Sequence, residues 1–148
     1  MSTPEHKLFL GVQRLANDLA QQTAALLKQS GLSGAQYNVL RILRGGGDSG
    51  LACGEIGERL LTKDPDITRL VDRLAKQGLV ERVRDETDRR VVKTSITRAG
   101  LELLAELDEP MLRLHKRQLG GLGRERVQEL LALIEAARLE VAGAGGSD

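Results

Sequence analysis

The sequence of 148 residues has very few aromatic side chains and a single cysteine. Phe9 and Tyr37 are the two aromatic residues, and tryptophan is absent. Proteins that bind single-stranded nucleic acid stack bases on aromatic rings, so this composition disfavours that class. The core must be built from Leu, Val, Ile and Ala, which suits helix packing. Because Cys53 has no second thiol to pair with, an intrachain disulfide is excluded.

Long apolar runs are also missing. No stretch approaches the roughly 20 apolar residues of a membrane helix. The first residues, MSTPEHKLF, lack the basic region and apolar region that mark a signal peptide. Together with the lone cysteine, these features predict a cytoplasmic protein that does not enter a membrane.

Motifs of catalysis and of metal binding are not found. His6 and His115 are far apart in the sequence, and neither has a Cys or His partner at metal-ligand spacing. The glycines at 45–47 lack the lysine and the preceding strand of a phosphate-binding loop. We therefore expect no enzyme activity, no catalytic residue, no metal ion and no cofactor.

Charge is present in quantity but is unevenly distributed. The net charge is only +1, yet residues 59–98 hold eleven Lys and Arg against seven Asp and Glu. This segment therefore carries +4 and the remainder of the chain −3. A basic middle between acidic ends is typical of a DNA-binding module flanked by scaffold.

Apolar residues at helical spacing predict a mainly α-helical fold. A long first helix is expected over residues 5–29, with Gly31 at its end. Ser33 and Gln36 form a capping box that opens a second helix. A short third helix is expected over residues 53–61. Two further helices follow, one that Thr97 caps at its start and one that ends near residue 142.

The fourth helix, over residues 65–77, has one apolar face and one polar face. We expect Asp64 to cap it, Pro65 to occupy its first position, and Gly78 to end it. Its apolar stripe consists of Ile67, Leu70, Val71 and Leu74. The residues that then face outward are Thr68, Arg69, Asp72, Arg73 and Lys76. Arginines at such a position can donate two hydrogen bonds to guanine.

A β-hairpin is predicted directly after this helix. Residues 79–84 and 90–96 are rich in β-branched side chains and flank a polar tip that contains Asp88, Arg89 and Arg90. An arginine at a hairpin tip suits the negative potential of a narrow minor groove. A basic helix followed by a basic hairpin is the order of a winged helix-turn-helix.

The string TRLVDRLAKQGLVERVRDETDRRVVKTSITRAG resembles the MarR family of bacterial transcriptional regulators. The resemblance implies a mainly α fold with a small β-hairpin wing, and a homodimer in which the first, fifth and sixth helices interlock. It places a winged helix-turn-helix lobe at 33–98 and N- and C-terminal dimerisation helices at 5–32 and 99–142, followed by a flexible tail at 143–148. It also implies that Arg90 enters the minor groove and that Asp88 orients it.

The function expected is a homodimeric, sequence-specific regulator of transcription that binds double-stranded DNA at a pseudo-palindromic operator. Repression relieved by a small-molecule effector is implied, although the sequence does not identify the pocket. Asp66 either contacts a base or only stabilises the helix start. The residues expected at the DNA are Lys63, Asp66, Thr68, Arg69, Arg73, Lys76, Arg84, Asp88, Arg89 and Arg90.

Two other interpretations stay open. Cys53, at a helix start, could make the protein a redox-responsive regulator that senses oxidants. The peroxide sensors of the family carry their reactive cysteine near the start of the first helix, where this chain has none. In the other interpretation the winged helix binds a partner protein, against which the basic wing argues.

Overall fold

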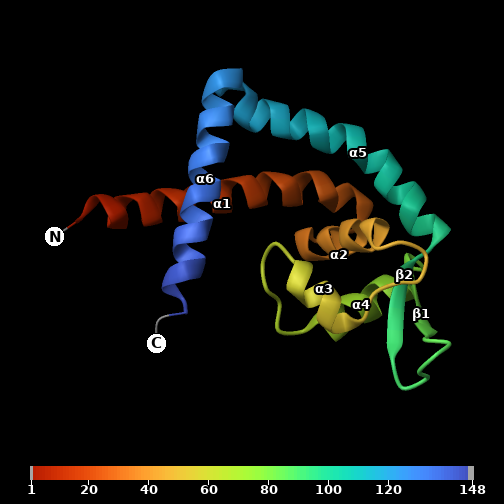
Figure 1. The fold of residues 1–148 in the computed structure, drawn as a ribbon. Helices are drawn as coiled ribbons and strands as arrows, with labels where there is room; N and C mark the ends of the chain where they lie inside the picture. The colour runs from red at the N-terminus through yellow and green to blue at the C-terminus, as the bar shows by residue number, and fades with distance from the viewer. Residues whose placement is uncertain (1, 147–148) are drawn as a thin grey trace. The chain divides into compact units, whose positions relative to one another are not determined.

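The computed structural model describes residues 2–146, and the chain divides into two compact units, Met1–Pro110 and Met111–Asp148. Helices dominate both units, and the strands described form one two-stranded antiparallel hairpin, so the predicted fold class is confirmed. The first unit contains α1 (Pro4–Leu27), a 3-10 turn η1 (Lys28–Ser30), α2 (Gly34–Gly45), α3 (Cys53–Arg59), α4 (Ile67–Lys76), β1 (Val80–Arg84), β2 (Val92–Ile96) and the first half of α5 (Arg98–Leu119) (Figure 1).

The start of α2 forms as the sequence predicts. The backbone N–H of Gln36 donates to Ser33 Oγ at 3.1 Å, and the N–H of Ser33 donates to Gln36 Oε1 at 2.9 Å. The two side chains therefore satisfy two backbone donors that the first turn would leave free. α1 ends two residues earlier than expected, because residues 28–30 tighten into η1 before Gly31 closes it at φ +69°.

The start of α4 corrects the prediction. Its N-cap is Asp66, whose carboxylate accepts the N–H of Arg69 at 3.1 Å, so the helix begins at Ile67. Asp64 instead accepts the N–H of Asp66 at 2.8 Å, and Pro65 stands before the helix. Both aspartates suit a cap, and the turn that Asp64 stabilises moves the start two residues along the chain.

The core of the first unit consists mainly of branched aliphatic side chains, together with the aromatic ring of Tyr37. α2 contacts α3, α4 and β2, and α4 also contacts β1. Each such side chain stabilises the fold by about 1.5–3 kcal/mol relative to an exposed position. Those that are at most 2% exposed include Val39, Leu40 and Leu43 of α2, Ile56 of α3, and Val71 and Leu74 of α4.

The hairpin is joined to the helices by backbone hydrogen bonds at two places. β1 pairs with β2 from Val80 opposite Ile96 to Arg84 opposite Val92. On the other edge of β2, Leu51 N–H donates to Thr94 O at 2.9 Å and Thr94 N–H donates to Leu51 O at 2.8 Å. The loop before α3 is thereby held against the hairpin.

The end of α4 and the start of α5 share one clamp. Gly78 has a left-handed backbone conformation, with φ +74°, which lets the N–H of Leu79 donate to the carbonyl of Leu74 at 3.0 Å. This hydrogen bond ends the helix. The Thr97 hydroxyl donates to Gly78 O at 2.7 Å and accepts the N–H of Gly100 at 3.2 Å. The predicted roles of Gly78 and Thr97 are therefore confirmed.

An ion pair connects α2 with α5 inside the first unit. The Arg44 guanidinium donates two hydrogen bonds to the Asp108 carboxylate, each at 2.9 Å. These bonds hold the pKa of Asp108 below its usual range and raise that of Arg44. The parallel two-bond geometry fixes orientation as well as distance.

The second unit comprises the last turns of α5, a 3-10 turn η2 (Gly120–Leu122) and α6 (Arg124–Ala144). α6 continues two residues beyond the predicted end, so the expected tail at 143–148 is helical as far as Ala144. Residues 147 and 148 of that tail lie outside the described residues. Across residues 2–146, no helix has both the length and the apolar character needed to cross a membrane.

Candidate nucleic-acid interface

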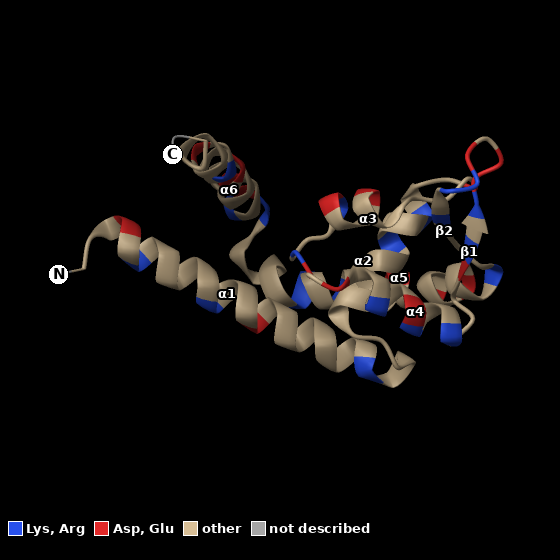
Figure 2. Ribbon diagram, turned by 90° about the horizontal axis from the view of Figure 1, so that it is seen from below, with Lys and Arg blue, Asp and Glu red and all other residues tan. Residues whose placement is uncertain are grey.

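α4 separates its apolar and polar residues as the sequence predicts. Leu70, Val71 and Leu74 are buried and Ile67 is half-buried. The opposite side of the helix bears exposed polar residues, among them two arginines, and Figure 2 shows basic residues on α4 and on the hairpin. The exposed residues of α4 that were expected at DNA are Thr68, Arg69, Arg73 and Lys76.

Two carboxylates beside these arginines are engaged within the protein. Asp66 caps α4 through the Arg69 N–H. Asp72, on the turn after Thr68, forms an ion pair with Arg82 of β1. We expected Asp72 to face solvent. Its ion pair with Arg82 instead joins α4 to the hairpin. The sequence held no signal for this contact beyond the opposite charges.

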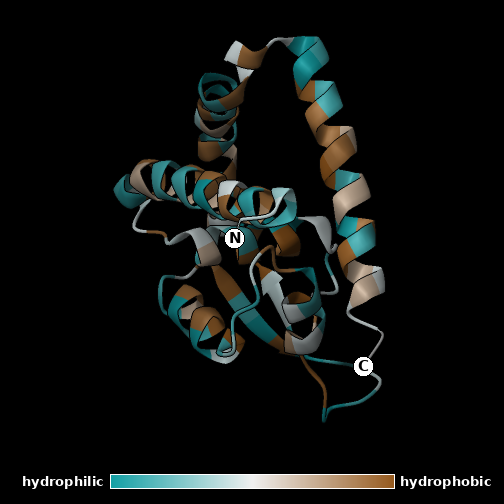
Figure 3. Ribbon diagram, turned by 90° about the vertical axis from the view of Figure 1, so that its left-hand side faces the viewer, coloured by the Kyte–Doolittle hydropathy of each residue, from teal (hydrophilic) through white to brown (hydrophobic). Residues whose placement is uncertain are grey.

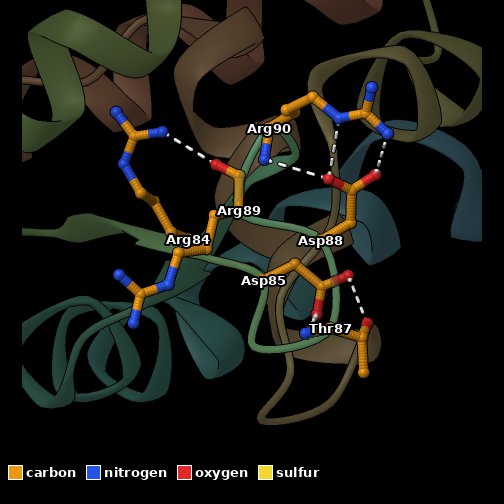
Figure 4. A network of polar contacts seen from close by, with 6 residues as sticks. All are labelled: Arg84, Asp85, Thr87, Asp88, Arg89 and Arg90. Atoms are coloured by element: carbon orange, nitrogen blue, oxygen red, sulfur yellow. Dashed lines mark hydrogen bonds and ion pairs between the residues drawn. The ribbon is translucent and has the colours of Figure 1, made fainter.

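The wing tip orients one arginine. Asp88 accepts three hydrogen bonds from Arg90: from its backbone N–H at 3.1 Å, from Nε at 3.1 Å and from Nη2 at 3.3 Å (Figure 4). The side-chain bonds, followed by the backbone bond, lower the pKa of Asp88. The Arg90 side chain is nevertheless 91% exposed. The ion pair implied by the family resemblance is thus present, with the arginine directed into solvent.

The rest of the tip is closed by short-range hydrogen bonds. Arg84 donates from Nη1 to the Arg89 carbonyl at 2.8 Å, while the Asp85 N–H donates to the Val91 carbonyl at 2.9 Å. Asp85 also accepts bonds from Thr87, at 3.5 Å from its N–H and 3.2 Å from its hydroxyl (Figure 4). The Arg84 guanidinium therefore supports the loop that presents Arg89 and Arg90.

Several basic residues of this surface have no acidic partner. Within residues 2–146, no carboxylate lies at ion-pair distance from any of them, so their charge is available to a polyanion. Lys63 precedes α4 and is exposed like the others. These residues are Lys63, Arg69, Arg73, Lys76 and Arg89.

Cys53 is the first residue of α3 and is half-buried. The bridge between Leu51 and Thr94 brings it close to the hairpin, where Arg82 and Arg84 lie nearby in a shared hollow. Sequence reasoning did not place Cys53 there, because a two-residue bridge to a distant strand has no local pattern.

α2, α3 and α4 followed by the β1–β2 hairpin form a winged helix-turn-helix. The MarR family model matches residues 30–91. The HTH-type transcriptional repressor IacR of Pseudomonas putida is 31% identical over 127 residues, which cover 86% of this chain and 75% of that protein. The chain belongs to the MarR family of transcriptional regulators.

Solved structures agree with this assignment. A crystal structure of a MarR transcription factor from Planctomyces limnophilus is 40% identical, with a TM-score of 0.70 over 92% of this chain and 98% of that chain. A point mutant of MarR from E. coli, complexed with operator DNA, has a TM-score of 0.80 at 22% identity, covering 88% of this chain and 93% of that chain. The protein is a DNA-binding transcriptional regulator, and regulators of this family are not enzymes.

Proposed function

We propose that this protein is a homodimeric, sequence-specific repressor that binds a pseudo-palindromic duplex and leaves it when a small molecule binds. The observation that carries the proposal is the joint presentation of two basic elements by one lobe. α4 exposes Arg69 and Arg73, and the wing holds Arg90 outward against Asp88. A helix and a hairpin tip so arranged fit a major groove and the adjoining minor groove.

Each residue then has a role that follows from its position. Arg69, Arg73 and Thr68 contact base edges, since they lie on the exposed side of α4. Arg90 enters the minor groove, oriented by Asp88. Asp66 stabilises the helix start rather than reading a base, because its carboxylate already accepts the Arg69 N–H. Contacts to phosphate groups are assigned to Lys63, Lys76, Arg84 and Arg89.

Residues 33–98 form the DNA-binding lobe in this proposal, and residues 5–32 and 99–142 form the dimer. The support is the exposed apolar surface of the terminal helices. Leu8, Phe9 and Val12 of α1 are 63%, 58% and 53% exposed. Leu131 and Val141 of α6 are 55% and 72% exposed, and Figure 3 shows hydrophobic residues along the helix that leads to the C-terminus. Apolar surface of this extent is typical of an interaction site.

A dimer with a twofold axis presents two copies of α4 to successive major grooves, about 34 Å apart. Repression is supported by the name of the Pseudomonas putida relative. A lipophilic or anionic effector releases the DNA only if it binds the released state more tightly than the DNA-bound state. In the alternative, oxidation of Cys53 delivers the signal. The Cys53→Ser variant distinguishes the two mechanisms, because release of DNA by a bound effector would be unaffected by that change.

The experiment that tests the proposal is selection of duplexes from a random library at near-physiological salt. Recovery of an inverted repeat with half-sites one helical turn apart is expected. Salt-sensitive binding without any recovered motif would contradict sequence-specific recognition, because the arginines would then contact only the DNA backbone.

A further inference from the structure

An acidic residue lies on the polar side of α4, where the proposed function calls for cations. The helix has the sequence ITRLVDRLAK, and its acidic residue is Asp72. The Asp72 carboxylate accepts a hydrogen bond from Nη2 of Arg82 in β1. The Arg82 side chain is 41% exposed and that of Asp72 is 46% exposed. The pair is therefore at the surface, where DNA bound to α4 and the wing could reach it.

The choice of partner is informative. Residues three and four apart on a helix are neighbours, so Asp72 could pair with Arg69 or with Lys76 of its own helix. Within residues 2–146, neither of these two cations has a carboxylate at ion-pair distance. Asp72 pairs across elements with Arg82 instead. The cations of α4 thus stay available to DNA, while the charge of a hairpin arginine is neutralised.

An unpaired Arg82 would change the charge of the hairpin. Arg82 and Arg84 are alternate residues of β1 and therefore point to the same face of the hairpin. Arg84 is one of the residues assigned to phosphate contacts. A second free guanidinium beside it would attract the DNA backbone of any sequence, because contacts to phosphate carry no sequence information. The pair of Arg82 with Asp72 sums to zero charge and so releases no counterion from DNA.

We propose that Asp72 is a positioning residue that determines specificity, because it holds the Arg82 guanidinium on α4 and away from phosphate. On random DNA, contacts to the backbone supply the binding energy, so a released Arg82 would only add to it. On the selected site, the same release would also break the ion pair between α4 and the hairpin, which there contact DNA together. Asp72 therefore weakens binding to random DNA more than binding to the selected site. The inference rests on the proposed function.

Asp72→Asn tests this, since it keeps the shape of the side chain and removes its charge. On a random duplex, the slope of log affinity against log salt should steepen by about 0.9, the value for one added phosphate contact. Affinity for that duplex at about 0.1 M salt should rise roughly fivefold. Affinity for the selected duplex should not rise, so the ratio of the two affinities should fall by the same factor.

Three further variants distinguish this role from a merely structural one. Asp72→Asn combined with Arg82→Gln removes both charges and should return the salt slope on random DNA to the wild-type value. Asp72→Glu keeps the carboxylate and should also keep that slope. The matched control is Glu102→Gln, which breaks the exposed ion pair with Arg98 in α5 and changes the net charge equally. It should leave the slope unaltered.

The outcomes separate failure of this inference from failure of the proposed function. An unchanged slope in Asp72→Asn, or a steeper slope that persists in the double variant, would overturn the inference. An equal rise in affinity for both duplexes would overturn the role in specificity. If selection recovers no motif, the proposed function fails, while the slope on random DNA still tests whether Asp72 neutralises Arg82. Chemical denaturation of each variant confirms that it is folded.

Discussion

Arg90 extends into solvent at the wing tip, yet three hydrogen bonds to Asp88 limit how its side chain can turn. We expect Arg90→Ala to weaken binding to every duplex and to lower the slope of log affinity against log salt by about 0.9, the value for one lost phosphate-neutralising charge. Binding measured over a range of salt concentrations checks this. An unchanged slope would mean that the wing does not contact DNA.

Asp88→Asn provides the matched change on the same ion pair. It keeps the cation but removes the charge that orients it. The salt slope should therefore be retained, while affinity falls by less than in Arg90→Ala. A loss in Asp88→Asn as large as that of the arginine variant would show that Asp88 itself is needed at the DNA.

Arg73 lies on the exposed face of α4, and no carboxylate holds it among the described residues. If it reads a base edge, Arg73→Ala should cost about 1–3 kcal/mol on the selected site and relax the preference at one base pair. Binding to single-base variants of the site measures this. An equal loss on random DNA would assign Arg73 to phosphate instead.

Elements of this fold meet through close backbone approaches as well as through side chains. A Cβ added to Gly100 would lie 2.4 Å from the Leu79 carbonyl oxygen and 2.6 Å from Ile96 Cγ1. Because a backbone oxygen cannot rotate away, Gly100→Ala should lower the free energy of unfolding by about 1–3 kcal/mol. The measurement is chemical denaturation.

Gly54, in α3, is the control for this change. Nothing lies within 4 Å of a Cβ built there. Gly54→Ala should therefore be neutral or stabilise the protein by about 0.5–1 kcal/mol, since alanine favours the helix. Equal destabilisation by both changes would contradict the role given to the contact between Gly100 and Leu79.

The ion pair between α2 and α5 gives stability a pH dependence. Arg44 lowers the pKa of Asp108 in the folded protein, so the pair stabilises it above the unfolded pKa of about 3.9. The effect is lost as the pH falls through the folded pKa. Both side chains are partly exposed, at 31% and 44%, so Asp108→Asn should cost about 1 kcal/mol or less at pH 7.

Denaturation at pH 7 and near pH 3 tests this expectation. The difference between Asp108→Asn and wild type should shrink at the acidic pH. Asp48→Asn, which changes an exposed carboxylate in the loop after α2, should leave stability unaltered at both. If Asp108→Asn lowers the free energy of unfolding by the same amount at both pH values, the charge of Asp108 is not the source of the effect.

The dimer that we propose depends on the exposed apolar residues of α1. Phe9→Glu places a charge in that surface and should shift the protein from dimer to monomer at micromolar concentration, as measured by analytical ultracentrifugation. Leu61, 89% exposed in the lobe, offers the control, and Leu61→Glu should leave the dimer intact. A wild-type protein that sediments as a monomer would contradict the dimer.

Much of this molecule could be predicted from local patterns. Ser33, Gly78 and Thr97 act at helix ends as expected, because a cap depends on neighbours within a few residues. The start of α4 was misplaced since Asp64 and Asp66 suit the same role. Contacts over long sequence separations, such as that of Arg44 with Asp108, leave no periodic trace in the sequence.

The same limit applies to the candidate site. Apolar spacing identified the exposed arginines of α4, and the family resemblance supplied the ion pair at the wing tip. The hollow beside Cys53 depends on the strand register and on the bridge from Leu51 to Thr94, which only the folded chain reveals. The sequence therefore did not predict the site residues that meet only when two distant elements pack together.

The clamp of Thr97 on Gly78 has a consequence for the genes that this protein controls. Its two hydrogen bonds join the end of α4, the base of the hairpin and the start of α5, so we expect α4 and the wing to keep a fixed spacing. In the proposed complex, the distance between the bases that α4 contacts and the flank that the wing contacts would then be constant. We expect promoters under its control to tolerate changes of sequence in that flank, but not the insertion or deletion of a single base pair before it.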